Sequence, residues 1–267
     1  MTPWKEKWAL VTGASAGIGI ALARELATGG ANLVLTARRT NRLEELAREL
    51  ASTHKISAEI CSADLAQPNA PEEIFQFTVA KRIEIDVLIN NAGFGQYGEF
   101  TNPDTKRLLD MVQVNCAAVV HLSRLYLPDM VRRRSGYVMI VASTASFQGV
   151  PYLSTYAATK AFDLLLAEGL AEEMKPHGVR VCALCPGSTE SEFSEVAGQS
   201  SLMAARRNRE TAEKVALVGL QALAAGKSQV ISGMGNYLGV HAQRLVPRRW
   251  VTRVAARLFR PAPEKPA

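Results

Sequence analysis

Seven short apolar runs, separated by segments of helical spacing, constrain the fold of this 267-residue chain more than any other feature. The runs are rich in β-branched residues and predict strands at Trp8–Thr12, Asn32–Thr36, Ser57–Cys61, Asp86–Asn90, Gly136–Ala142, Arg180–Cys185 and Gln229–Ile231. Between them apolar residues recur at helical spacing, as at Ile18, Leu22 and Leu26. Strands that alternate with helices predict an α/β fold, a doubly wound parallel sheet of about seven strands with helices on both faces.

Composition is consistent with one domain built around a single large core. Hydrophobic residues make up 48% of the chain, and no run approaches the roughly 18 apolar residues that a membrane-spanning helix needs. The first expected strand begins at Trp8, which leaves no room for a signal peptide. The four cysteines form no secreted-type framework, and the four histidines are scattered. We therefore expect a cytoplasmic protein without a metal site.

A glycine-rich turn follows the first expected strand directly, as Thr12-Gly13-Ala14-Ser15-Ala16-Gly17-Ile18-Gly19, and helical spacing begins at once. Glycines let the backbone approach a phosphate closely, and the amides at the start of the next helix favour its negative charge. The sequence indicates a dinucleotide-binding turn. Taken alone, the same pattern also fits a tight structural connection between strand and helix.

The end of the second expected strand bears on the choice of nucleotide. An acidic residue there would bind the adenosine ribose of NAD, but the chain has Ala37 followed by Arg38 and Arg39. Guanidinium groups bind a 2′-phosphate, so NADP(H) is favoured, with Arg38 the stronger candidate and Ser15 as a further donor. The alternative is that both arginines are merely solvated. Asp64 is placed either to accept from the adenine amino group or to cap the next turn.

Chemically reactive side chains cluster in the second half of the alternating region. Ser143 ends a strand, and Tyr156 and Lys160 are four residues apart at the start of a helix, so they share one face. A cation beside a phenol favours the phenolate, so we expect Lys160 to lower the pKa of Tyr156.

These motifs, together with Asn90-Asn91-Ala92-Gly93, Asn115 and Pro186-Gly187, resemble those of the short-chain dehydrogenase/reductase family. The motifs are similar to those of the family's NADP-preferring bacterial-type group, and the resemblance covers about the first 187 residues. It implies a single Rossmann-type domain and a catalytic set of Asn115, Ser143, Tyr156 and Lys160. In that family, Tyr156 would exchange a proton with the substrate oxygen, Ser143 would stabilise that oxygen, and Lys160 would tune Tyr156.

The resemblance also implies the remaining site residues. The cofactor-binding set is Gly13, Ser15, Gly17, Ile18, Gly19, Arg38, Arg39, Asp64, Leu65, Asn91, Ala92, Gly93, Tyr156, Lys160, Pro186, Gly187 and Thr189. The substrate-binding set is Ser143, Phe94, Phe147 and Tyr152. The predicted function is an NADP(H)-dependent oxidoreductase that interconverts a small-molecule carbonyl and alcohol. The alternative is a non-catalytic NADP(H)-binding sensor or a protein that contacts membranes or partners.

The C-terminal region departs from the rest in charge. We expect a domain over residues 1–243, with a candidate substrate lid at 188–210, and a basic amphipathic tail over 244–267. From Ala225 onward, eight Lys or Arg residues face a single Glu, and Pro247–Arg260 has helical spacing with Trp250, Val251, Val254, Ala255 and Leu258 on one face and Arg249, Arg253, Arg257 and Arg260 on another.

Three positions stay open for this apolar face: an anionic membrane surface, a second subunit, or the chain's own domain. Peripheral attachment at the inner face of a membrane therefore remains an option. No nucleic-acid-reading motif accompanies the basic tail, so we expect no nucleic-acid partner. The family resemblance implies a homodimer or homotetramer.

Overall fold

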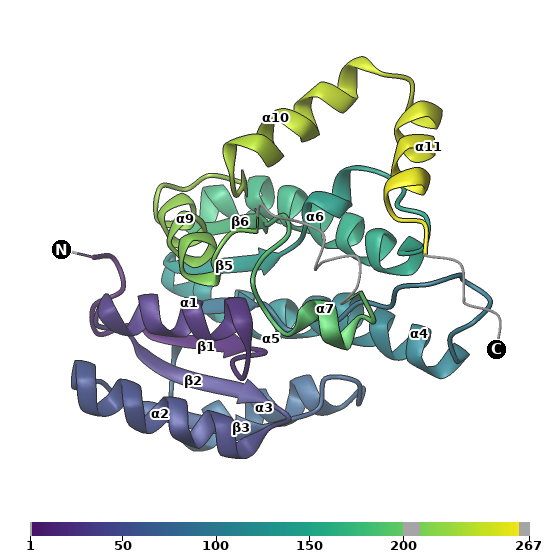
Figure 1. The fold of residues 1–267 in the computed structure, drawn as a ribbon. Coiled ribbons are helices and arrows are strands. Elements are labelled where there is room, and N and C mark those ends of the chain that lie inside the picture. Colours follow the sequence, from purple (N-terminus) through teal and green to yellow (C-terminus); the bar gives the residue numbers. More distant parts are fainter. Residues whose placement is uncertain (1, 200–208, 262–267) are drawn as a thin grey trace.

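The computed structural model of the chain describes residues 2–199 and 209–261. One parallel sheet of seven strands runs in the order β3-β2-β1-β4-β5-β6-β7 (Figure 1). The strands are β1 Trp8–Thr12, β2 Asn32–Ala37, β3 Ala58–Ser62, β4 Ile85–Asn90, β5 Gly136–Val141, β6 Val179–Cys185 and β7 Gln229–Ile231. The predicted fold class is confirmed, with strand boundaries within one residue of those expected.

Helices cover both faces of the sheet (Figure 1). One face carries α1 (Gly17–Thr28), α2 (Thr40–His54) and α9 (Ala212–Ala224), and the other carries α3 (Ala70–Ala80), α5 (Ala118–Arg133) and α6 (Ser154–Met174). The central strands β1, β4, β5 and β6 are almost wholly buried because each of their faces packs against helices. Short helices α4 (Thr105–Val112) and α7 (Phe193–Val196) lie near the carboxyl ends of the strands.

The strand order reverses at β1, which pairs with β2 on one side and β4 on the other. The chain therefore leaves β1 and β4 toward opposite faces of the sheet, and a crevice opens beyond their carboxyl ends. The glycine-rich turn and the Asn90–Gly93 segment both start at this point. The sheet topology thus brings these two sequence motifs together.

Residues 234–258 form an arch of α10 (Met234–Ala242) and α11 (Arg248–Leu258), seen at the upper right of Figure 1. The helix expected at Pro247–Arg260 is present as α11, whereas α10 was not expected. Thr211 caps the N-terminus of α9, because its hydroxyl accepts from the Lys214 N–H.

The apolar face expected on α11 is divided between the chain's own domain and solvent. Ala255 is 4% exposed, while Trp250, Val254 and Leu258 are 51%, 52% and 61% exposed. Just beyond the helix, the Tyr97 hydroxyl donates to the Phe259 carbonyl at 2.9 Å. The tail therefore docks partly on its own domain. Within the described ranges, no helix combines the length and apolar character needed to cross a bilayer.

Gly19 offers a test of how tightly α1 packs against the turn that precedes it. A Cβ at Gly19 would collide with the Gly13 carbonyl oxygen and lie 2.7 Å from Asn91 Nδ2. We expect Gly19→Ala to lower the free energy of unfolding by about 1–3 kcal/mol, because the backbone must shift to relieve the overlap. Urea unfolding monitored by circular dichroism measures this change.

Gly169→Ala is the matched control, because Gly169 also lies in a helix and has no atom within 4 Å of its added Cβ. There the change should stabilise the protein by about 0.5–1 kcal/mol, since alanine favours helix. Equal effects of the two substitutions would contradict this account of the turn.

Candidate active site

A cavity of about 640 Å³ occupies the crevice where the strand order reverses. Its walls come from the glycine-rich turn, the ends of β2, β3, β4, β5 and β6, the start of α6 and the segment 186–199. The cavity therefore brings together residues that are more than 100 positions apart in the sequence. Most of the side chains singled out in the sequence lie around it.

The glycine-rich turn forms one wall of the cavity. Gly13 and Gly17 line it with φ of +66° and +49°, in the left-handed region that favours glycine. Ser15 and Ile18 line the same wall. Gly19 does not line the cavity: it lies behind the turn, where the absence of a side chain lets α1 approach Gly13, and its expected contact with the nucleotide stays a prediction.

The Thr12 hydroxyl fastens the end of β1 to the end of β4. It donates to the Ile89 carbonyl at 3.1 Å and accepts from the backbone N–H groups of Asn91 and Ala92, each at 2.9 Å. Asn91 Nδ2 returns a hydrogen bond to the Thr12 carbonyl at 2.8 Å. These bonds fix the spacing between the turn and the wall formed by Asn91, Ala92 and Gly93. Thr12 was not among the expected site residues.

A cluster of arginines marks one end of the cavity. Arg38 and Arg39 both line it, and Arg39 donates from Nε to Ser15 Oγ at 3.2 Å and from Nη2 to the Ser15 carbonyl at 3.0 Å. Glu192 of the segment 186–199 pairs with Arg39 at 2.7 Å and also with Arg42. Hydrogen bonds from Arg42 and Arg39 lower the pKa of the Glu192 carboxyl. Arg42 was missed, although its position three residues after Arg39 in the first turn of α2 was a signal.

Asp64 and Leu65 lie at the same end of the cavity, after β3. Asp64 Oδ1 accepts from the Ala66 N–H at 3.1 Å. This is the capping role that the sequence left open, and it holds the carboxylate at the cavity wall.

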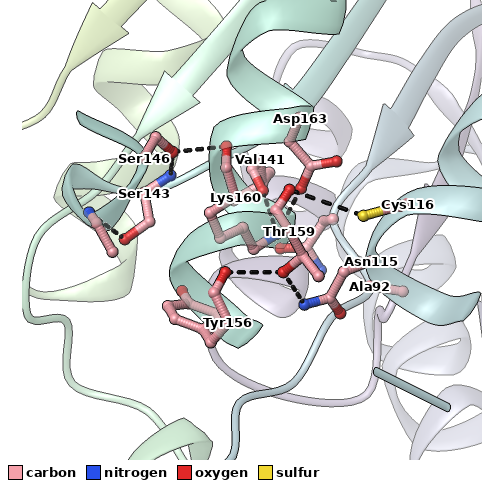
Figure 2. Close-up of polar contacts among 12 residues, drawn as sticks. Ala92, Asn115, Cys116, Val141, Ser143, Ser146, Tyr156, Thr159, Lys160 and Asp163 are labelled. Carbon is pink, nitrogen blue, oxygen red and sulfur yellow. Dashed lines mark hydrogen bonds and ion pairs between the residues drawn. The ribbon is translucent and has the colours of Figure 1, made fainter. Parts of the chain in front are cut away.

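Ser143, Tyr156 and Lys160 come together at the other end of the cavity (Figure 2). Tyr156 and Lys160 share one face of α6, and Ser143 follows β5, where its Oγ accepts from the Ala145 N–H at 3.1 Å. Lys160 Nζ donates to the Val141 carbonyl at 2.7 Å and pairs with Asp163 Oδ2 at 2.9 Å. Asp163 was not expected, although it lies three residues after Lys160 on the same helix face.

Asn115 stands behind this group rather than at the cavity surface. It is fully buried in a π-helical turn, Gln113–Ala117, and does not line the cavity. Its Nδ2 donates to the Phe94 carbonyl and to Thr159 Oγ1, both at 3.0 Å, and its Oδ1 accepts from the Phe94 N–H at 3.1 Å. Asn115 thereby ties the Gly93–Phe94 segment to α6.

The electrostatics of Tyr156 differ from the sequence expectation. Burial raises the pKa of the Tyr156 phenol, and this effect outweighs the lowering by the Lys160 charge and by the Ser143 hydrogen bond. The Phe193 ring contributes to the burial, with its centroid 5.2 Å from that of Tyr156. Lys160 therefore lowers the pKa of Tyr156 as expected, but its effect is smaller than that of burial, and the net pKa is raised.

The expected substrate-binding residues divide into two groups. Phe94 and Ser143 line the cavity, whereas Phe147 and Tyr152 do not, so the substrate contacts expected of these two residues stay predictions. The Phe147 ring packs into the apolar core on the α5–α6 face, and Tyr152 occupies a turn with φ of +66° whose carbonyl accepts from the Gly98 N–H. Further apolar side chains that line the cavity are Val150, Leu153, Phe193 and Phe259.

The segment after β6 closes the remaining side of the cavity, which Pro186, Gly187 and Thr189 line as expected. The expected lid at 188–210 is described only in part, because residues 200–208 lie outside the described residues. In the described part, Ser191 lies against the turn, 2.7 Å from an added Cβ at Gly17. Among the described residues, no group of three or more His, Cys, Asp or Glu side chains gathers in a way that would hold a metal ion.

Comparison with known proteins agrees with this geometry. A family model described as short chain dehydrogenase matches residues 7–201, which include the glycine-rich turn, Ser143, Tyr156 and Lys160. The chain belongs to the short chain dehydrogenase family.

Individual members of the short chain dehydrogenase family are moderately similar to the chain. A very-long-chain 3-oxoacyl-CoA reductase of Danio rerio is 35% identical over 71% of this chain and 62% of its own length. An uncharacterized oxidoreductase of Staphylococcus epidermidis is 31% identical over 73% of this chain and 83% of its own length. The chain spans only 59% to 62% of the length of three very-long-chain 3-oxoacyl-CoA reductases to which it is similar.

The likeness to solved structures extends over nearly the whole chain. A short-chain dehydrogenase of Sphingobium yanoikuyae in complex with NADPH superposes with a TM-score of 0.80, and the match covers 98% of each chain at 27% identity.

Proposed function

We propose that this protein is an NADP(H)-dependent oxidoreductase that interconverts a carbonyl and an alcohol. The observation that carries the proposal is the single cavity that holds a phosphate-binding turn with arginines at one end and Ser143, Tyr156 and Lys160 at the other. A phosphorylated dinucleotide needs both ends, because its phosphates and its reactive ring lie far apart. The relatives in the family support the same reaction class.

The donor set fits NADP(H). Gly13 and Gly17 have no side chain to obstruct a pyrophosphate, and the N-terminus of α1 faces it. Arg38, Arg39 and the Ser15 hydroxyl offer a 2′-phosphate charged and neutral donors, and Glu192 would give up its ion pairs there. The solved relative that holds NADPH supports this choice of nucleotide.

Tyr156 acts as the general acid in reduction and as the general base in oxidation. Its raised pKa keeps the phenol protonated near neutral pH, which suits the donation of a proton to a carbonyl oxygen. The bound nucleotide supplies the hydride. Ser143 donates to the same oxygen, Lys160 holds its positive charge beside Tyr156, and Asn115 fixes the wall opposite them.

The substrate is a carbonyl compound with an apolar substituent. Val150, Leu153, Phe193 and Phe259 surround the space beside Tyr156, and a similar family member is a 3-oxoacyl-CoA reductase. NADPH absorbance measured with a panel of aldehydes, ketones, diones and 3-oxoacyl thioesters tests this choice. Failure of every compound would favour the alternative, a non-catalytic NADP(H) sensor. The complete set of Ser143, Tyr156 and Lys160 argues against that alternative, because a protein that only binds the nucleotide does not need these side chains.

We propose further that α10 and α11 attach the protein to an anionic membrane surface. Trp250, Val254 and Leu258 form an exposed apolar stripe on α11. The arch also carries six arginines and no Asp or Glu between Met234 and Pro261, so its charge complements anionic lipid headgroups.

A homodimer or homotetramer stays a prediction. Its support is a second group of exposed apolar side chains on three neighbouring helices, α4, α5 and α6, comprising Leu109, Val112, Val120, Phe162 and Leu165. This group is separate from the stripe on α11. The domain division at residue 243 and the lid likewise remain predictions.

Removal of the Tyr156 hydroxyl tests the reaction. We expect Tyr156→Phe to lower kcat by about 10²- to 10⁴-fold, because the carbonyl oxygen loses its proton donor. The Kd for NADPH, measured by fluorescence titration, should stay near that of the parent. Tyr152→Phe is the matched control, since Tyr152 does not line the cavity. Near-normal turnover by Tyr156→Phe would refute the mechanism.

The choice of nucleotide is tested at the arginine end. Arg39→Ala should raise the Kd for NADPH about tenfold or more, since a hydrogen bond to a charged group is worth about 1.5–3 kcal/mol. The Kd for NADH should change little, because NADH has no 2′-phosphate. Arg48→Ala on the same helix is the control, as Arg48 is exposed away from the cavity. Equal weakening of both nucleotides would remove the support for a 2′-phosphate site.

Membrane attachment is tested by vesicle flotation of the full-length protein. The parent should float with vesicles that contain phosphatidylserine but not with phosphatidylcholine alone, and added salt should weaken the binding. Replacing Trp250, Val254 and Leu258 together by Gln should abolish flotation, whereas Val79→Gln, at an exposed apolar site on α3, should not. Unchanged flotation of the triple variant would show that this stripe does not bind the membrane. If light scattering gave the triple variant a different mass from the parent, the stripe would instead belong to an interface with a second subunit.

A further inference from the structure

Asp163 is a buried carboxylate beside the reacting groups, and none of the proposed steps uses it. It lies on α6 at 0% exposure, and its Oδ2 pairs with Lys160 Nζ at 2.9 Å (Figure 2). Its Oδ1 has no hydrogen-bond partner among the described residues. Burying a carboxylate with one oxygen unsatisfied is unfavourable, so Asp163 depends on Lys160 for its compensation.

The contacts of Lys160 determine where its ammonium points. An ammonium has three N–H donors, and two of them go to Asp163 Oδ2 and to the Val141 carbonyl, at 2.9 and 2.7 Å. A Cβ added at Gly93 would lie 3.4 Å from Lys160 Nζ, so the ammonium borders the cavity wall at this glycine. With two donors held by buried acceptors, the third is left for the cavity.

We propose that Asp163 is a positioning residue that fixes the Lys160 ammonium in place and offsets part of the positive charge that Tyr156 experiences. Tyr156, Lys160 and Asp163 then lie in a row along one face of α6, at positions i, i+4 and i+7, with the ammonium next to both the phenol and the carboxylate. The inference rests on the proposed role of Tyr156 as the proton donor.

The surroundings make Asp163 the dominant negative charge for this pair. Cys116 approaches from the π-helical turn and Cys185 from β6, and burial raises the pKa of each thiol to about 12, so both stay neutral. Ser143 contributes only a neutral hydroxyl. For Lys160, burial lowers the pKa, but the charge and hydrogen bond of Asp163, together with smaller contributions from Tyr156 and Cys116, outweigh it, so the net pKa is raised and the ammonium persists. The Asp163 charge also raises the pKa of Tyr156.

The direction of the pH effect follows from the sign of the charge that is removed. Asp163→Asn takes away a negative charge, and this lowers the pKa of both Tyr156 and Lys160. The pair therefore loses its first proton at lower pH, whichever side chain releases it. Reduction requires the protonated phenol, so the alkaline limb of kcat/KM for reduction should move to lower pH by about one unit or more.

The experiment compares pH profiles of Asp163→Asn and Asp163→Ser with the parent. The serine variant is smaller and neutral, so the measurement does not depend on the folding of one substitution. Glu173→Gln is the matched control, because it makes the same carboxylate-to-amide change at an exposed site on α6. Asp163→Glu, which retains the charge, should keep the parental alkaline limb while lowering kcat. Alkaline limbs of the neutral variants that coincide with that of the parent would overturn the proposal.

A second readout needs neither nucleotide nor turnover. NMR titration of protein labelled at lysine and tyrosine follows Lys160 and Tyr156 directly, with their signals assigned by loss in Lys160→Gln and Tyr156→Phe. In Asp163→Asn, the first of the two side chains to deprotonate should do so at lower pH than in the parent. Unchanged titration would refute the role of Asp163. Inactivity of the parent with every carbonyl compound would instead refute the proposed function and leave this titration still measurable.

Discussion

The site depends on the hydrogen bonds of Thr12, which join the ends of two strands that leave the sheet in opposite directions. Where β1 and β4 separate, their backbone groups would otherwise face a gap, and a single buried hydroxyl serves a carbonyl and two N–H groups. Those bonds set the distance between the phosphate-binding turn and the wall from Asn91 to Gly93. The cavity can be open and still keep a defined shape, because these hydrogen bonds hold two of its walls together.

The two ends of the cavity handle charge differently. At the arginine end, the groups are partly exposed, so an incoming phosphate can replace Glu192 without leaving an uncompensated charge in a dry interior. At the Tyr156 end, Lys160 and Asp163 are buried as an ion pair, in which attraction between the two charges opposes the effect of burial on both pKa values. The arginine end is suited to exchange of the Glu192 carboxylate for a phosphate. The Tyr156 end is suited to holding charges in fixed positions around a proton transfer.

Much of the fold could be predicted because its determinants are local and periodic. Strand runs, the glycine spacing and the Tyr156–Lys160 interval are each read from neighbouring residues, and all appear in the structure. What a sequence does not show is side-chain direction and long-range burial. Phe147 and Tyr152 are near Ser143 in sequence, yet one packs into the core and the other lies in a turn. The net pKa of Tyr156 cannot be read from a four-residue spacing, which shows the cation but neither the covering Phe193 nor Asp163.

The short segment from Ser191 to Phe193 touches both ends of the cavity: Glu192 binds the arginines, and Phe193 covers Tyr156. A ligand that displaces Glu192 breaks the ion pairs that hold this segment in place next to Phe193. Occupancy at one end is then thermodynamically linked to access at the other, and the linkage must be reciprocal. Through this segment, binding of an anion at the arginines and binding of a ligand beside Tyr156 each change the affinity for the other.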